Sequence, residues 1–200
     1  QTVLGTQENL KNPSITNIKN YYKQWYVPNN MAICMSGDLD PDATIALIDK
    51  YFGGLKPNPE LPKLDLPKEA PITQPVVKEV LGPDAESVAL AWRFPGVSDK
   101  DFEILQVVSQ VLYNGKAGLI DLDLNQQQKV LNSYGYPMGL ADYSALLLGG
   151  LPKQGQTLEE VKDLLLSEIK KLRAGEFDEK MLEANINNFK LGELQNMESN

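Results

Sequence analysis

Carboxylates come closest to a catalytic pattern in this sequence. Asp121 and Asp123 lie on either side of Leu122, and with Glu103 they supply the residue types that general acid–base chemistry requires. Acidic residues that alternate with leucine are, however, typical of the solvated face of a short amphipathic helix. We therefore interpret both aspartates as surface residues rather than as catalytic groups.

A second acidic run, at residues 38–42, has the composition of a calcium-binding loop, and Asp49 stands at the twelfth position of that loop. Such a loop needs glycine at its sixth position, where this chain has Ala43, and Pro41 would obstruct the turn. A helix with Asp40 as its N-cap and Pro41 in its first turn accounts for the same residues. We therefore predict a helix start and no calcium site.

Gly115 and Gly118 enclose Lys116, but this stretch lacks the G-x-x-x-x-G-K-[ST] spacing of a phosphate-binding loop. Trp25 and Trp92 are interpreted as core residues rather than as ligand platforms. None of these features predicts a binding site.

The sequence contains no histidine. This excludes Ser-His-Asp and Cys-His pairs, and it excludes zinc sites built on two histidines, such as H-x-x-E-H. We therefore expect no catalytic residue and no metal ligand in this chain, and the sequence leaves its substrate-binding residues unassigned.

The net charge and the composition limit the classes of partner that the chain can be expected to bind. The net charge of −8 is spread along the chain, which argues against nucleic acid, because phosphate binding needs clustered Lys and Arg. No apolar run reaches the ~18 residues that span a bilayer, so we expect no membrane partner. Cys34 cannot form an internal disulfide, because it is the only cysteine, and it is predicted to be a buried core residue. Cysteine usage therefore does not indicate whether the protein works in an oxidising or a reducing compartment.

The sequence begins at Gln1 without a methionine or a signal peptide, and it stops at Asn200 within a helix-like pattern. We therefore expect it to be a piece of a longer protein.

The first block of elements covers residues 1–57. Ser14 begins a predicted helix, residues 31–36 read as a short buried strand, and Asp40 begins a second helix that ends at Gly53. The inward faces of the two helices are predicted to carry Ile15, Ile18, Tyr22 and Trp25, and Ile45, Ile48 and Phe52. Residues 58–75 follow as a proline-rich linker, because proline removes backbone donors and favours extended chain.

The second block covers residues 76–200. Strands are predicted at 76–81 and 87–94, joined as an antiparallel hairpin by a turn at 82–84. Val88, Leu90, Trp92 and Phe94 are expected on one face of the second strand, with Ala89, Ala91 and Arg93 on the other.

Helices and two more strands complete the second block. The patterns predict a helix capped by Ser98 that ends near Leu112, a short helix at 119–124, and strands at 129–137 and 141–148. Thr157 and Glu160 form a capping box before a helix that ends at Gly175, and Asp178 caps a last helix. The predicted class is α+β, an antiparallel sheet with helices on one face, preceded by a helix–strand–helix piece.

Several short motifs, taken in order, resemble the end of the catalytic repeat of the pitrilysin/insulinase zinc metallopeptidases. The first block holds a G-x-x-E-x-L segment from Gly5, then Y-x-P-x-N-M from Tyr26, a Gly37-Asp38 turn, and a helix that ends in Phe52-Gly53. The second block continues the resemblance into the next repeat, through the segments at 88–95, 101–112 and 143–148.

The resemblance implies a peptidase of about four repeats, or a two-chain version of one, that hydrolyses peptides with zinc inside an enclosed chamber. Residues 1–57 would end the catalytic repeat and residues 76–200 would form a non-catalytic one. The zinc motif would lie before Gln1, so this chain would bind no zinc and be inactive alone. Peptides, other repeats or a homologous subunit are the implied partners. Arg93 is a candidate to meet a peptide or another repeat.

Two other interpretations stay open. Some relatives of this family have lost the metal motif, so the parent could be a scaffolding or partner subunit. A free-standing ferredoxin-like ligand module would fit the second block but leaves the first unexplained. We expect a periplasmic or cell-envelope location rather than a cytoplasmic one.

Overall fold

The computed structural model of the chain describes residues 5–63 and 67–198, and the chain divides into two compact units, 1–70 and 71–200. The division falls within the predicted linker, 58–75, of which residues 64–66 lie outside the described residues. Each unit is described separately.

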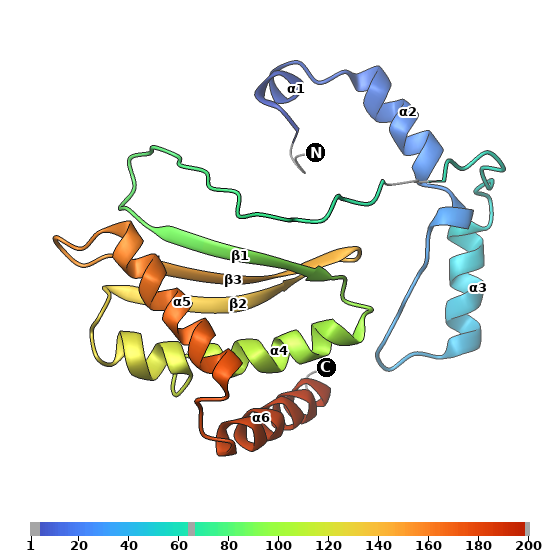
Figure 1. Ribbon diagram of the computed structural model, residues 1–200. Coiled ribbons are helices and arrows are strands. Elements are labelled where there is room, and N and C mark those ends of the chain that lie inside the picture. Colours follow the sequence, from blue (N-terminus) through green and yellow to red (C-terminus); the bar gives the residue numbers. More distant parts are fainter. Residues whose placement is uncertain (1–4, 64–66, 199–200) are drawn as a thin grey trace. The chain divides into compact units, whose positions relative to one another are not determined.

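Unit 1 is helical (Figure 1). It contains α1 (Gln7–Lys11), α2 (Ile15–Trp25), a single 3₁₀ turn η1 (Pro28–Asn30) and α3 (Pro41–Phe52). The side chains of Thr6, Ser14 and Asp40 each accept a hydrogen bond from the backbone N–H three residues later, at 3.4, 3.3 and 3.0 Å. These bonds satisfy donors that the first turn of a helix leaves unpaired, and they confirm the predicted starts of α2 and α3.

The predicted strand at 31–36 is wrong. These residues form no strand, and among the described residues the backbone of 32–36 makes no hydrogen bond. Cys34 is exposed, so its predicted burial is wrong as well. A strand requires a neighbour that pairs with its backbone groups, and apolar composition alone does not supply one.

The apolar faces predicted for α2 and α3 do not pack into a hydrophobic core in unit 1. Ile45 and Phe52 of α3 are exposed, and so are Ile15, Ile18 and Tyr22 of α2, while Ile48 of α3 is half-buried. Trp25, which was predicted to be a core residue, is half-buried. Among the described residues of unit 1, only Val27 is buried. Asn29 joins the end of η1 to Asn58, donating from its side-chain nitrogen to the Asn58 carbonyl at 2.8 Å and accepting from the Asn58 N–H at 3.0 Å.

Unit 2 is built on a three-stranded antiparallel sheet. Its strands are β1 (Val88–Pro95), β2 (Asn132–Gly139) and β3 (Tyr143–Leu151), in the order β1-β3-β2. Leu148 at the centre of β3 is paired with Leu90 on one side and with Gly135 on the other. The three strands confirm the predictions at 87–94, 129–137 and 141–148, with β2 and β3 shifted by two or three residues.

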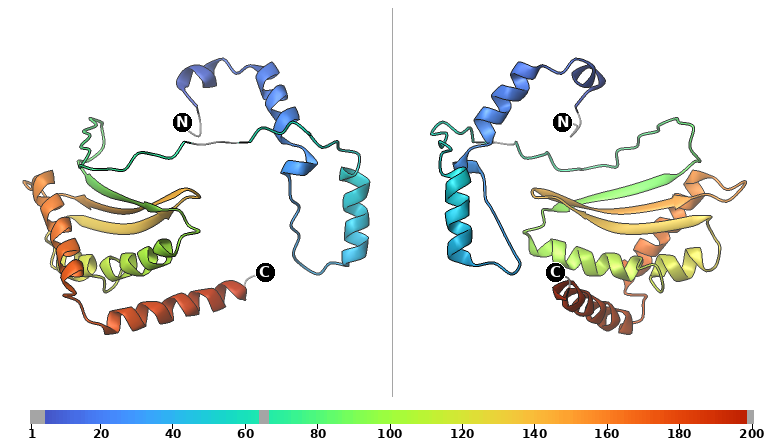
Figure 2. Two further views of the ribbon diagram at one scale, coloured as in Figure 1. Left: turned by 45° about the vertical axis from the view of Figure 1, so that its right-hand side comes forward. Right: turned by 180° about the vertical axis from the view of Figure 1, so that it is seen from behind.

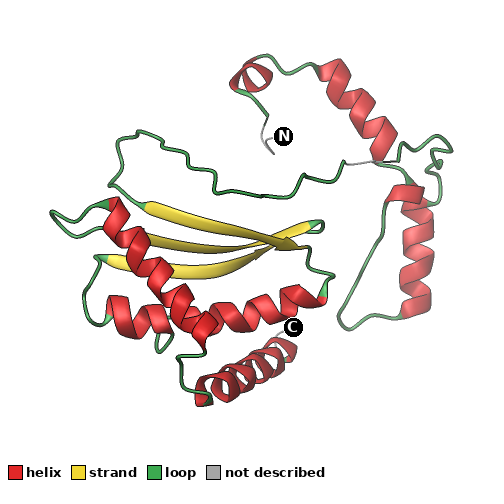
Figure 3. Cartoon of the chain, in the orientation of Figure 1, coloured by secondary structure: helices red, strands yellow, loops and turns green. Residues whose placement is uncertain are grey.

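Helices cover one face of this sheet, as the views in Figures 1 and 2 agree. α4 (Lys100–Leu112) and α5 (Leu158–Ala174) pack on the sheet, and α6 (Lys180–Met197) packs on α4. A π-helical turn η2 (Asp121–Asn125) lies where a short helix was predicted. Figure 3 shows α4 and α5 on one side of the sheet, which confirms the α+β class. The buried apolar core comprises Leu105, Val111, Leu112, Leu119, Ile120, Leu124, Val130, Leu146, Leu148, Val161 and Leu165.

Local capping explains the bounds of these helices. Thr157 and Glu160 form the predicted capping box at the start of α5, and Gly175 ends the helix with φ 73°, the left-handed conformation that glycine adopts without a Cβ penalty. Asp99, not Ser98, caps α4, because its Oδ1 accepts from the Asp101 N–H at 2.9 Å. The N-cap position of α6 is Glu179 rather than the predicted Asp178, although Asp178 Oδ1 accepts from the Lys180 N–H at 2.9 Å.

The predicted hairpin between 76–81 and 87–94 is also wrong. Residues 76–81 are extended but belong to no strand, and Val77, Val80 and Leu81 are about nine-tenths exposed. Within the described parts of the chain, residues 71–87 make no backbone hydrogen bond. The apolar pattern predicted a strand, but pattern alone does not show that a pairing edge is in reach.

Candidate functional surface

Alternation along the three strands gives the sheet two different faces. Val88, Leu90, Trp92 and Phe94 pack against the core beneath the helices, as predicted, which confirms Trp92 as a core-side residue. The opposite face, which we call the open face, is not covered by the helices of unit 2. Its central residues are Ala89, Ala91 and Arg93 of β1, Tyr143, Ala145, Leu147 and Gly149 of β3, and Tyr134, Tyr136 and Met138 of β2.

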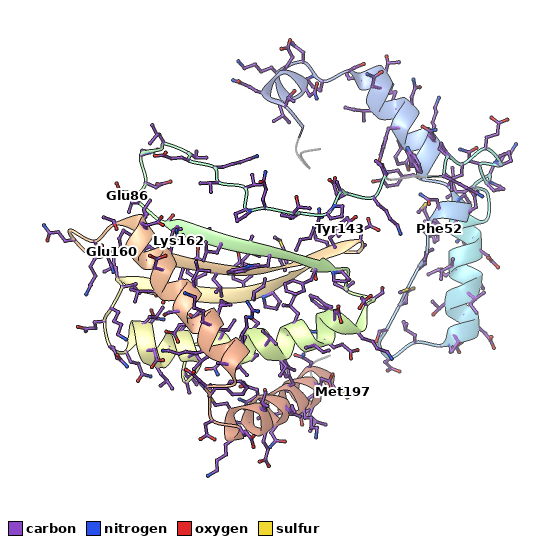
Figure 4. The ribbon with its side chains drawn as sticks, in the orientation of Figure 1. Phe52, Glu86, Tyr143, Glu160, Lys162 and Met197 are labelled. Carbon is purple, nitrogen blue, oxygen red and sulfur yellow. The ribbon has the colours of Figure 1, made fainter. Side chains whose placement is uncertain are left out.

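Two contacts that involve aromatic rings lie on the open face, one with a guanidinium group and one between two tyrosines. Tyr143 lies at the end of the sheet where β1 stops and β3 begins (Figure 4). The Arg93 guanidinium lies over the Tyr143 ring, 5.0 Å from its centroid. The rings of Tyr134 and Tyr136 stack with centroids 6.2 Å apart and an interplanar angle of 16°. The predicted position of Arg93 on the face opposite Trp92 is confirmed.

Asp121 is not the surface residue that the sequence suggested. It is 5% exposed, and its Oδ2 accepts three backbone hydrogen bonds, from Asn114 at 2.9 Å and from Gly115 and Gly118 at 3.0 Å. The carboxylate therefore holds the 114–118 loop against η2. The N–H groups of Gly115 and Gly118 are therefore occupied by a carboxylate of the protein itself, in agreement with the prediction that this stretch is no phosphate-binding loop.

Asp123 also has a structural partner. The Lys171 Nζ of α5 donates to Asp123 Oδ2 at 2.6 Å and to both oxygens of Glu168, at 2.9 and 3.1 Å. The Lys171 hydrogen bond holds the pKa of Asp123 below its ordinary value, although burial acts in the opposite direction. Burial lowers the pKa of Lys171, but its hydrogen bonds to Asp123 and Glu168 outweigh burial and raise that pKa overall.

Glu103, Asp121 and Asp123 do not come together in one cluster. Glu103 is exposed on the first turn of α4, and no contact described in the structure joins it to Asp121 or Asp123. Asp40 caps α3 with Pro41 in its first turn, as the sequence predicted. Within residues 5–63 and 67–198, no three His, Cys, Asp or Glu side chains come together in a group that would hold a metal ion.

Comparison with known proteins identifies the relatives of the chain. Residues 14–189 match the family model described as the peptidase M16 inactive domain. The zinc protease PqqE of Helicobacter pylori is 26% identical over 205 residues, which cover 99% of this chain and 46% of that protein. A probable mitochondrial-processing peptidase subunit beta of Schizosaccharomyces pombe is 31% identical over 68 residues, or 34% of this chain and 15% of that protein.

Solved structures give the same result for the fold. A protease from Helicobacter pylori matches with a TM-score of 0.80 at 22% identity, over 98% of this chain and 48% of that one. The first half of the periplasmic protease PqqL from Escherichia coli matches with a TM-score of 0.63 at 18% identity, over 96% and 42%. The chain thus spans about half the length of the relatives that it matches most fully. Since the family model covers most of the sequence, the chain belongs to the M16, or pitrilysin/insulinase, family of peptidases and corresponds to its inactive domain.

Proposed function

We propose that this chain is the non-catalytic part of a zinc metallopeptidase, and that unit 2 forms a wall of the chamber in which the parent protein hydrolyses peptides. The observation that carries this proposal is the asymmetry of the sheet: helices and core cover one face, while the helices of unit 2 leave the other face uncovered. A domain built in this way can enclose a substrate without supplying chemistry to it.

The residues present do not fit the zinc that the family name implies. The chain has no histidine, and its most buried carboxylates, Asp121 and Glu168, already bind backbone N–H groups and Lys171. Zinc would therefore be held by another part of the parent protein. There, zinc activates water for attack on the peptide bond, and unit 2 would restrict access to short or unfolded peptides.

The test compares the intact parent protein with a form shortened to end at about Pro75. We expect the shortened form to keep its zinc and to lose peptide turnover, because the zinc ligands would lie outside unit 2. Peptide turnover is measured with short and long substrates, and metal content by atomic absorption. Undiminished turnover of both substrates by the shortened form would refute the chamber role.

A second candidate is a scaffolding or partner subunit whose parent has lost the metal motif. One relative is named as a subunit of the mitochondrial-processing peptidase, which supports a parent that works together with a partner chain. The two proposals differ in the parent's sequence: an H-x-x-E-H motif about one hundred or more residues before Gln1 supports the peptidase, and its absence supports the scaffold.

We also propose a periplasmic location for the parent. The name of the periplasmic protease PqqL supports this, since its structure shares the fold of this chain. Within the described residues, no helix combines the length and the apolar composition needed to cross a bilayer. Cell fractionation of the source organism, with antibody against unit 2, tests the location, and recovery with the cytoplasmic fraction would contradict it.

A further inference from the structure

Residues 31–36 have the composition of a buried strand but a backbone without a partner. The chain leaves η1 in an extended conformation, with φ −126° and ψ 146° at Met31, and continues toward α3 (Figure 1). Among the described residues, the backbone of 32–36 makes no backbone–backbone hydrogen bond. The segment carries no charge, and its alternating side chains Met31, Ile33 and Met35 are 41%, 44% and 55% exposed. An uncharged run of this kind is typical of a strand that is covered on both faces.

The helices before and after this segment also have uncovered apolar faces. Ile18 and Tyr22 of α2 are 58% and 59% exposed, and Ile45 of α3 is 57% exposed. The opposite face of α2 is polar and carries Asn20 and Gln24. Neither helix packs extensively on another helix or strand of the described chain. Since a helix in a protein is stabilised mainly by the packing of its apolar face, both helices and the segment between them lack a partner.

The groups that are left free indicate the kind of partner. A row of unpaired N–H and C=O groups is satisfied by the edge of another strand, whereas a helix has already paired its own backbone groups and a hydrocarbon surface offers neither donors nor acceptors. Apolar helix faces next to a strand pack on the sheet to which that strand belongs. The partner that fits is therefore a β-sheet with a free edge and an apolar face.

The lengths of the relatives indicate where such a sheet is found. This chain covers 46% of the zinc protease PqqE and 48% of the solved Helicobacter pylori protease, so more than half of each lies outside the part that it matches. We propose that residues 31–36 pair as an added strand with a sheet in the remaining part of the parent protein, and that α2 and α3 pack their apolar faces on that sheet. This inference rests on the proposed function, because it names the surface by which the non-catalytic part attaches to the rest of the peptidase.

The first experiment measures hydrogen exchange in the intact parent protein by mass spectrometry. We expect the amides of residues 32–36 to exchange about 100-fold more slowly than in an unstructured chain, because pairing in a sheet protects them. Residues 72–74 are the internal control, since among the described residues they also make no backbone–backbone hydrogen bond, and they should exchange at the unstructured rate. Unprotected exchange of residues 32–36 would overturn the inference.

The second experiment identifies the partner by photo-crosslinking within the intact parent. Tyr22 is replaced by p-benzoylphenylalanine, which keeps an aromatic ring on the apolar face of α2, and the same replacement at Asn20, on the polar face, is the matched control. We expect position 22 to cross-link to peptides outside residues 1–200 and position 20 to lose these cross-links. Cross-links from position 22 to unit 2, or to a second copy of the protein, would each overturn the inference. Both experiments measure packing rather than turnover, so their failure is distinguishable from failure of the chamber role.

Discussion

At the scale of single residues, the polar groups of unit 2 hold the structure together. Glu168 is 1% exposed, and its charge is compensated by Lys171, which also reaches Asp123 on η2. A buried carboxylate without such a partner is expensive, because the protein interior solvates charge poorly. The cluster of Asp123, Glu168 and Lys171 therefore ties the π-helical turn to α5.

Replacing Lys171 tests this cluster. Lys171→Met leaves Glu168 buried without its cation, and because Lys171 is about one-third exposed we expect a loss of about 2 kcal/mol in the free energy of unfolding, less than for a fully buried pair. Urea unfolding followed by circular dichroism measures it. Lys170→Met, at an exposed neighbouring position on the same helix, is the control and should change stability by less than about 0.5 kcal/mol. Equal stabilities of the two variants would contradict the role of the cluster.

The lowered pKa of Asp123 predicts a pH dependence. A carboxyl group whose pKa is lower in the folded state stabilises the protein above its unfolded pKa, about 3.9, and loses that contribution as the pH falls through the folded value. Asp123→Asn should therefore reduce stability at pH 7 and converge with the wild type below about pH 4. Urea unfolding across this range measures both curves. Asp84→Asn, at an exposed loop position, should stay parallel to the wild type.

At the scale of elements, the sequence predicted those whose signals are local. The capping box at Thr157, the glycine stop at Gly175 and the alternation of β1 each depend on neighbouring residues, and the structure confirms all three. The strands at 31–36 and 76–81 were wrong because pairing depends on a partner edge that no local pattern reveals. The burial of Asp121 was missed for a related reason, since its three donors come from a loop whose path is set by tertiary structure.

The packing of α5 on the sheet gives a prediction at this scale. Leu165 is fully buried in the core, and α5 lies so close to β3 that a Cβ on Gly150 would press against Val161. Leu165→Ala should lower the free energy of unfolding by about 2–5 kcal/mol, because it removes buried apolar atoms and leaves a cavity. Leu131→Ala, which truncates the same side chain at 67% exposure, should cost less than about 1 kcal/mol. Urea unfolding of both variants makes the comparison, and a similar loss in each would mean that Leu165 is not a core contact.

At the scale of the whole molecule, the most informative features of the sequence were the absence of histidine and the order of several weak motifs. The first excludes a site built on two histidines, and the second predicted the family that the comparisons confirm. The open face needed the structure, because its residues come from three strands spread over more than fifty positions and meet only through the register of β3 with both neighbours.

The last prediction concerns the chain between the two units. We predict that residues 56–75 are the most protease-sensitive internal stretch of the protein. Six prolines in this stretch prevent regular backbone pairing, and its described residues belong to no helix or strand. Cleavage should concentrate after Glu60, because the side chains of Asn29 and Asn58 hold the beginning of the stretch to the end of η1.

Limited digestion with thermolysin, followed by mass spectrometry of the early fragments, measures this. Thermolysin cleaves before apolar residues that are not followed by proline, so Ile72 in the stretch is compared with Leu105 of α4. We expect the first cut before Ile72, and slow appearance of any cut within α4, whose backbone is hydrogen-bonded as a helix and whose Leu105 is buried. The denatured chain, digested in parallel, is the control and should be cut at both places at similar rates. First cleavage of the folded protein inside α4 would show that the division between the units is misplaced.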